Sequence, residues 1–176
     1  MITERIYLIG MPGSGKSTEG KQLAKYLGWA FIDLDILVEE MAGNSIATIF
    51  AHEGEMYFRN LEKAALEKTF IINRVIIACG GGTIAFEDNM KQINLHGASL
   101  YLNASNNFLL SRIKASKMPR PMFLGLSEEE ILSKIIELRA KREVFFSLAK
   151  AQIDIPHEGG KALLKKAYKL FNLNLK

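Results

Sequence analysis

The chain contains, over residues 6–18, the stretch Ile-Tyr-Leu-Ile-Gly-Met-Pro-Gly-Ser-Gly-Lys-Ser-Thr. Its first four residues form a short apolar run with β-branched side chains, which predicts a buried strand. From Gly10 to Ser17 the residues have the spacing G-x-x-x-x-G-K-[ST]. Residues 17–27 follow with apolar side chains at helical spacing. Strand, glycine loop and helix therefore occur in the order that a phosphate-binding loop requires.

The residue types in this loop suit a triphosphate. Glycines let consecutive backbone N–H groups turn toward an anion, and the N-terminus of the following helix adds partial positive charge. We expect Lys16 to reach the β- and γ-phosphates and the Ser17 hydroxyl to coordinate Mg²⁺. The alternative is a glycine-rich turn that matches by chance, and the flanking strand and helix argue against it. The sequence thus predicts a nucleoside triphosphate site formed by Gly13, Ser14, Gly15, Lys16, Ser17 and Thr18.

Length and composition predict one globular domain over residues 1–176. Hydrophobic residues make up 48% and charged residues 24%, which is typical of globular proteins. The net charge of +4 is modest, and the lysines that gather over residues 161–169 fit the solvated face of a terminal helix. The single cysteine excludes an internal disulfide. Since no signal-like or membrane-length apolar run is present, we expect a cytoplasmic monomer without nucleic-acid or membrane partners.

Two acidic residues follow the second predicted strand, which spans residues 29–34. Asp33 and Asp35 are two positions apart, so an extended chain would direct both carboxylates to the same side. In open α/β sheets, ligands bind beside the carboxyl ends of the strands. The pair therefore suggests one carboxylate near a metal and one near an attacking nucleophile. A helix cap is the alternative, because aspartate is a favourable N-cap for a helix that begins near Ile36.

The rest of the chain alternates between predicted helices and strands, an α/β pattern. Two prolines flank Arg120 and predict an irregular cationic loop over residues 114–125. Ser127 and Glu130 have the spacing of a capping box at the start of a long helix. The predicted helices cover residues 36–42, 45–52, 54–70, 106–113, a segment from Ser127 and a terminal segment, and the later strands cover residues 75–79, 98–102 and 152–155.

Two further patterns lie beside these elements. Arg59 and Glu62 are three residues apart on a predicted helix, where they can meet, although such a pair is usually a weak surface ion pair. Three glycines, residues 80–82, follow a strand and permit close approach of a ligand to the backbone. We interpret Cys79, within that strand, as a small buried residue rather than a nucleophile.

Along essentially its whole length, the chain resembles the shikimate kinase family. The resemblance rests on the ordered set of the phosphate loop, Asp33-x-Asp35, Gly54-Glu55 with Phe58-Arg59-x-x-Glu62, Gly80-Gly81-Gly82, Arg120-Pro121 and Arg142. It implies a P-loop kinase of the nucleoside-monophosphate-kinase type: a five-stranded parallel sheet flanked by helices. It also implies a mobile lid over about residues 114–125 and a substrate-binding helical region over about residues 34–62.

The resemblance implies transfer of the γ-phosphoryl group of ATP to the 3-hydroxyl of shikimate, a step toward chorismate and the aromatic amino acids. A related small-molecule kinase, such as a gluconate kinase, and a nucleotide-binding module without turnover stay open as alternatives. The shikimate kinase family usually has a tyrosine shortly after the late arginine, where this chain has Phe145-Phe146. The lid continues with Met122-Phe123 in place of the commoner pair of leucines.

The resemblance also implies roles for individual residues. Arg120 is the lid arginine that closes over the phosphates, and Glu62 orients Arg59. Arg112 is a candidate nucleotide-side arginine. The implied catalytic residues are Lys16, Asp35 and Arg120; the ATP-binding residues are those of the loop with Arg120; the shikimate-binding residues are Asp35, Arg59, Gly81, Gly82 and Arg142; and the Mg²⁺ residues are Ser17 and, through water, Asp33.

Overall fold

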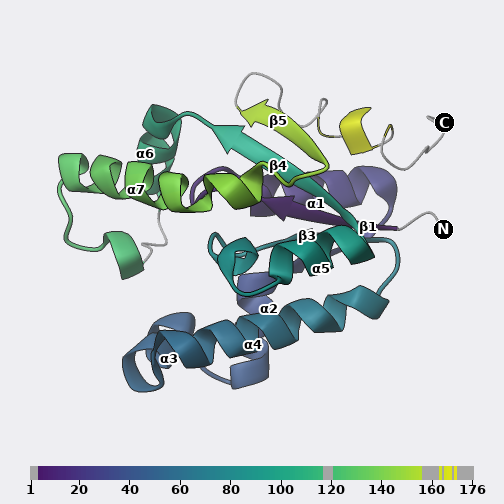
Figure 1. Cartoon of the computed structure of the whole chain (residues 1–176), viewed down its shortest axis with the longest axis horizontal. Coiled ribbons are helices and arrows are strands. Elements are labelled where there is room, and N and C mark those ends of the chain that lie inside the picture. Colours follow the sequence, from purple (N-terminus) through teal and green to yellow (C-terminus); the bar gives the residue numbers. More distant parts are fainter. Residues whose placement is uncertain (1–3, 117–120, 156–162, 164, 168, 170–176) are drawn as a thin grey trace.

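The structure is a computed structural model that describes residues 4–116, 121–155, 163, 165–167 and 169. The described residues form a five-stranded sheet with the order β2-β3-β1-β4-β5, in which every neighbouring pair is parallel (Figure 1). The sequence resemblance predicted this sheet. Its strands are β1 (Arg5–Ile9), β2 (Ala30–Asp33), β3 (Val75–Ala78), β4 (Ala98–Ala104) and β5 (Ala151–Ile155).

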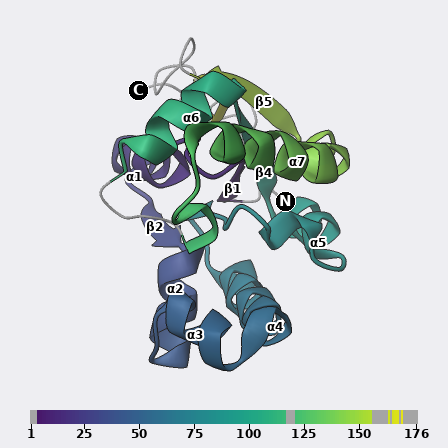
Figure 2. The same ribbon diagram turned by 90° about the vertical axis from the view of Figure 1, so that its left-hand side faces the viewer.

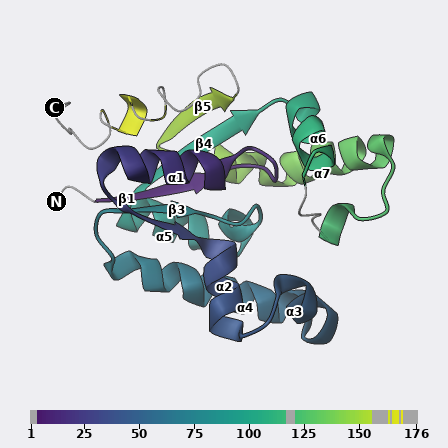
Figure 3. The same cartoon turned by 180° about the vertical axis from the view of Figure 1, so that it is seen from behind.

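Helices cover both faces of this sheet. Helix α1 lies on one face, and α5 and α7 lie on the other (Figures 1 and 3). Helices α2, α3 and α4 form a group beside the β2 edge, away from α6 and α7 (Figure 2). The helices are α1 (Lys16–Leu27), α2 (Leu34–Ala42), α3 (Ile46–His52), α4 (Gly54–Lys68), α5 (Asn89–His96), α6 (Asn106–Lys114) and α7 (Glu128–Phe146), with short 3₁₀ turns η1 (Thr69–Ile71), η2 (Thr83–Ala85) and η3 (Pro121–Phe123).

The central strands read as continuous apolar runs because helices cover them on both sides. Every residue of β3 is buried. On one face α1 approaches closely at Gly20, where a β-carbon would lie 2.6 Å from Cε2 of Phe31. On the other face the Tyr7 hydroxyl lies 3.0 Å from Oγ1 of Thr69, and burial raises the pKa of Tyr7 to about 12. Contacts on both faces thus fix the sheet below the loops that follow the carboxyl ends of its strands.

The structure corrects several predicted boundaries. The second strand ends at Asp33, so Leu34 and Asp35 belong to α2. Helix α4 ends at Lys68 and continues only as a 3₁₀ turn. Helix α5 was not predicted, because Asp88 makes no side-chain cap and few apolar positions mark its inner face. Its packing against η2 and β4, rather than its local sequence, places this helix.

The predicted irregular loop contains one short element. Residues 121–123 form η3, which the prolines permit because a 3₁₀ turn needs few backbone hydrogen bonds. Residues 117–120, and with them Arg120, lie outside the described residues. Within the described part of the chain, each helix is too short or too polar to span a lipid bilayer.

The predicted capping box at the start of α7 is confirmed. The Glu130 amide donates to Oγ of Ser127 at 3.3 Å, and the Ser127 amide donates to Oε2 of Glu130 at 2.7 Å. We expect Ser127→Ala to lower the free energy of unfolding by about 1 kcal/mol, because the Glu130 amide loses its acceptor. Urea denaturation measures this change. Ser111→Ala, on the exposed face of α6, is the control and should be neutral, so an equal loss in both variants would contradict the assignment.

Candidate functional site

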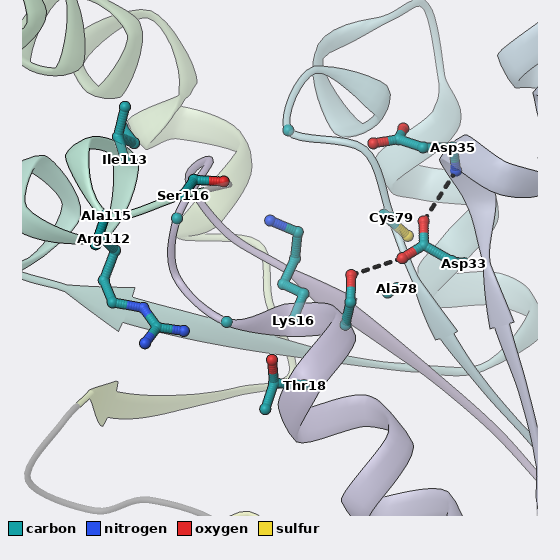
Figure 4. Close-up of a pocket in the computed structure, with 14 residues that line it drawn as sticks. Lys16, Thr18, Asp33, Asp35, Ala78, Cys79, Arg112, Ile113, Ala115 and Ser116 are labelled. Atoms are coloured by element: carbon teal, nitrogen blue, oxygen red, sulfur yellow. Dashed lines mark hydrogen bonds between the residues drawn. The ribbon is translucent and has the colours of Figure 1, made fainter. Parts of the chain in front are cut away.

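The phosphate loop joins β1 to α1 as predicted. Gly15 takes φ 91°, a left-handed conformation that glycine adopts without strain, and directly precedes α1. The Lys16 ammonium donates to the carbonyls of Gly10 at 2.9 Å and Met11 at 3.1 Å, so its side chain lies along the loop (Figure 4). Oγ of Ser14 is buried and has no hydrogen-bond partner among the described residues. The position of the loop at the N-terminus of α1, with a lysine beside it, is typical of an anion-binding site.

Asp33 has the helix-cap role that the sequence left open, and it also contacts the phosphate loop. Its Oδ1 accepts the Asp35 amide at 3.2 Å and caps α2, while its Oδ2 accepts the Ser17 hydroxyl at 2.6 Å (Figure 4). The expected placement of both carboxylates on one side of an extended strand is wrong, since Asp35 already lies in the first turn of α2. Helix initiation, rather than strand alternation, directs both side chains toward the site.

A pocket of about 300 Å³ connects these groups. The loop and the start of α1 form one side, Asp33, Asp35 and the end of β3 form the second, and the end of α6 with Arg112 forms the third (Figure 4). Its lining residues are Gly13, Gly15, Lys16, Ser17, Thr18, Asp33, Asp35, Ala78, Cys79, Gly81, Arg112, Ile113, Ala115 and Ser116. The volume suits part of a polyphosphate and its acceptor.

The oxygen donors in this pocket fit Mg²⁺. Ser17 and Asp33 supply a hydroxyl and a carboxylate, the hard ligands that Mg²⁺ prefers. The described residues contain no group of three or more His, Cys, Asp or Glu side chains able to hold a metal. Mg²⁺ usually retains water and phosphate oxygens beside one or two protein ligands, so this sparse donor set agrees with a metal that arrives with the nucleotide.

The three glycines after β3 lie where the side chains of other elements converge. A β-carbon at Gly82 would lie 2.7 Å from Nη2 of Arg59. At Gly81 a β-carbon would lie 3.1 Å from the Pro12 ring and 3.3 Å from Nη1 of Arg142. A β-carbon at Gly82 would thus require the Arg59 guanidinium group to shift, and one at Gly81 would press closely on the Pro12 ring and Arg142. The triplet thus lies between two arginines, and its central glycine also adjoins Pro12 of the phosphate loop.

The two arginines are partly withdrawn from solvent. Nη1 of Arg59 donates to Glu62 at 2.7 Å, and Nη2 lies 3.2 Å from Glu55. Because Glu62 is buried, the interpretation of Arg59 and Glu62 as a weak surface ion pair is wrong. Arg142 is 7% exposed, and its buried Nη1 has no hydrogen-bond partner among the described residues. Burial, and next the positive charge of Arg59, lower the pKa of the Arg142 guanidinium. An anionic group between the arginines would satisfy both.

Residues near the triplet were missed by sequence reasoning. Gly80 faces Glu62 and Asp35, Thr83 bonds to Glu62, and Asn89 bonds to Thr83. The position of Thr83 directly after the glycines was the available signal, whereas Asn89 lies in the helix that was not predicted.

Cys79 is buried next to the pocket, and burial raises its thiol pKa, so the interpretation of Cys79 as a small buried residue rather than a nucleophile holds.

Phe145-Phe146 stand where the shikimate kinase family usually has a tyrosine, and this difference leaves the surrounding side chains well packed. Phe146 is buried and stacks on Tyr101, with ring centroids 4.4 Å apart and planes inclined by 7°. The Tyr101 hydroxyl donates to Asn103 at 3.1 Å and lies 3.4 Å from Nη1 of Arg139. The aromatic pair therefore fixes α7, which carries Arg142, against β4.

Comparison with known proteins places the chain in a family. A sequence model described as shikimate kinase matches residues 12–166. A shikimate kinase of Parabacteroides distasonis is 38% identical over 151 residues, which cover 86% of this chain and 87% of that protein. A shikimate kinase structure from Bacteroides thetaiotaomicron has TM-score 0.89 and 32% identity, covering 96% of this chain and 98% of that chain. The structure of an Acinetobacter baumannii shikimate kinase in complex with shikimate has TM-score 0.85 and 31% identity, covering 98% and 96%. The phosphate loop, the glycine triplet with its two arginines and these matches together establish that the chain belongs to the shikimate kinase family.

Proposed function

We infer that this protein transfers the γ-phosphoryl group of ATP to the 3-hydroxyl of shikimate, forming shikimate 3-phosphate on the route to chorismate. One observation carries the inference most directly. Arg59 and Arg142 meet at a glycine triplet that also contacts the phosphate loop through Pro12. A hydroxy acid held by its carboxylate at the arginines would place its ring hydroxyls toward the bound phosphates. A module that only binds nucleotide would have no use for this second cluster of positive charge.

The phosphate side of the reaction depends on the loop. Backbone N–H groups and the N-terminus of α1 would hold the triphosphate, and Lys16 would move from its loop carbonyls to the β- and γ-phosphates. Ser17 and, through water, Asp33 would hold Mg²⁺. When bound, the metal bridges phosphate oxygens and offsets their charge. Phosphoryl transfer is catalysed mainly by such positioning and electrostatic stabilisation.

The acceptor side depends on Asp35 and the arginines. We assign Asp35 to accept the proton of the 3-hydroxyl as that oxygen attacks the γ-phosphorus and the bond to the ADP oxygen breaks. Arg59 and Arg142 would bind the carboxylate, with Gly81 and Gly82 giving the acid close access to the backbone. Because Arg142 is buried with an unpaired donor, carboxylate binding would relieve an existing electrostatic cost.

The remaining assignments belong to the same proposal. A lid over residues 114–125, with Arg120 closing on the phosphates, and a substrate-binding region over residues 34–62 would exclude water during transfer. Arg112, which lines the pocket, is then a nucleotide contact. The enzyme is proposed to act as a cytoplasmic monomer with ATP and shikimate as its small-molecule partners.

An assay of purified protein with ATP and Mg²⁺ tests the function. A panel of hydroxy acids that includes shikimate and gluconate should give ADP and phosphorylated product fastest with shikimate. Faster turnover of gluconate would favour the related-kinase alternative. Binding of ATP without acid-dependent turnover would favour the non-catalytic module.

Arg59→Ala is expected to raise the KM for shikimate about 100-fold while changing the KM for ATP little, because a charged contact to the carboxylate is lost. Steady-state kinetics with each substrate varied in turn separates the two effects. Lys68→Ala removes an exposed cation at the far end of the same helix and is the matched control. A defect confined to ATP would refute the assignment of Arg59.

A further inference from the structure

Behind the substrate-facing arginine lies a chain of buried hydrogen bonds. Nη1 of Arg59 donates to Oε2 of Glu62 at 2.7 Å. The Thr83 hydroxyl donates to the other oxygen, Oε1, at 2.5 Å. The Asn89 side chain then donates to the Thr83 carbonyl at 2.9 Å. Glu62 is 1% exposed, Thr83 0% and Asn89 1%, so these three residues are almost fully withdrawn from solvent.

Three elements meet in this chain. Glu62 lies on α4, Thr83 begins η2 directly after the glycine triplet, and Asn89 begins α5. Gly80 provides the space between them, since a β-carbon there would lie 2.4 Å from Oε1 of Glu62 and 3.0 Å from Oγ1 of Thr83. The same point is 2.8 Å from Oδ1 of Asp35. The hydroxyl of Thr83 therefore stands where the acid-binding and proton-accepting parts of the site adjoin.

The directions of these bonds set the orientation of Glu62. A hydroxyl has a single proton to donate, and in this geometry Thr83 gives it to Oε1. With Oε1 held, Oε2 is turned toward Arg59. A buried carboxylate that loses a donor must find another partner or rotate, because an unsatisfied charged oxygen is costly away from water. Rotation of Glu62 would release the guanidinium group that it holds beside Gly82.

We propose that Thr83, held in place by Asn89, is a positioning residue that orients Glu62 and through it the shikimate-binding Arg59. This proposal rests on the proposed function, which supplies the carboxylate that Arg59 receives. Thr83 touches neither substrate in this role. Thr83 preorganises the contact between Arg59 and the carboxylate before the acid binds. Its contribution is therefore to the affinity for the acid rather than for the nucleotide.

Thr83→Val tests the proposal, because valine keeps the shape of threonine and removes the hydroxyl. We expect the KM for shikimate to rise about tenfold, with the KM for ATP unchanged, since the lost bond is to a charged group. Thr83→Ser restores the hydroxyl and should return the KM for shikimate to within about twofold of the original value. A crystal structure of Thr83→Val should show Glu62 rotated from its position against Arg59.

Thr69→Val is the matched control. Thr69 is another fully buried threonine, just beyond the end of α4, and its hydroxyl bonds to the Leu66 carbonyl at 2.6 Å. Its replacement should lower the melting temperature without changing either KM. Equal rises in the shikimate KM for Thr69→Val and Thr83→Val would reduce Thr83 to a general stability role and overturn the proposal.

The outcomes separate this proposal from the proposed function. Wild-type protein without shikimate-dependent turnover would overturn the function. Wild-type turnover combined with an unchanged shikimate KM in Thr83→Val would overturn the role of Thr83 alone. If Thr83→Val does not fold, Thr83→Ala carries the same test with a smaller side chain, and the same tenfold rise is expected.

Discussion

Lys16→Met is expected to lower kcat by about a thousandfold, because the substitution removes the cation that stabilises charge developing on the transferred phosphoryl group. The methionine side chain has similar length and can occupy the same buried channel along the loop. The loop backbone, whose geometry depends on Gly15, should remain able to hold the triphosphate. The loss should therefore appear mainly in kcat, with a smaller rise in the KM for ATP.

The control for this prediction is Lys25→Met. Lys25 is exposed in the last turn of α1, the same helix that Lys16 begins, and should give kcat within about twofold of the original. Circular dichroism melting checks that both variants are folded. Retention of kcat in folded Lys16→Met would mean that another cation supplies the stabilisation, and the proposed role of Lys16 would have to be abandoned.

The phosphate half of the site could be predicted from sequence because its signals are local. The strand, the loop and the helix that form it are contiguous, and the spacing from Gly10 to Ser17 prescribes both the backbone and the side chains. The apolar run that became β3 was equally clear, since a strand covered on both faces needs no alternation. The capping box of Ser127 likewise involves only neighbours in the chain.

The proposed acid-binding half depends on contacts between distant segments. The spacing of Arg59 and Glu62 does not distinguish a buried pair from an exposed one, and the structure adds contacts from segments such as Thr83, 21 residues after Glu62. Arg142 lies on a long helix whose apolar pattern is weak, so its burial could not be derived from periodicity. The family resemblance indicated these arginines and Glu62, but not Thr83 or Asn89 behind them.

The glycine triplet explains why the two halves form one site. Gly81 adjoins Pro12 of the phosphate loop and Arg142 of α7. Gly80 on one side adjoins the carboxylates of Glu62 and Asp35, and Gly82 on the other adjoins Arg59. Three consecutive residues without side chains thus permit the close approach of these groups. In the proposed function, this packing sets the position of the acceptor relative to the phosphates.

Asp35→Asn is expected to lower kcat by about 100- to 10,000-fold, the range in which a positioned proton acceptor contributes to catalysis. Asparagine has the same shape and can still accept a hydrogen bond, but it cannot take the proton of the attacking hydroxyl. The amide of residue 35 should still donate to Asp33, so the cap of α2 and the bond from Ser17 to Asp33 are retained. The KM for ATP should therefore change little.

Pre-steady-state measurement of phosphoryl transfer distinguishes this role from a structural one, because it reports the chemical step apart from product release. Glu40→Gln, an exposed carboxylate-to-amide change on the same helix, is the matched control and should leave the rate of transfer unaltered. If Asp35→Asn transferred phosphate at the original rate, the hydroxyl would be attacking without a protein base. The electrostatic arrangement of the loop would then account for the whole of catalysis, and Asp35 would serve only to bind the ring hydroxyls.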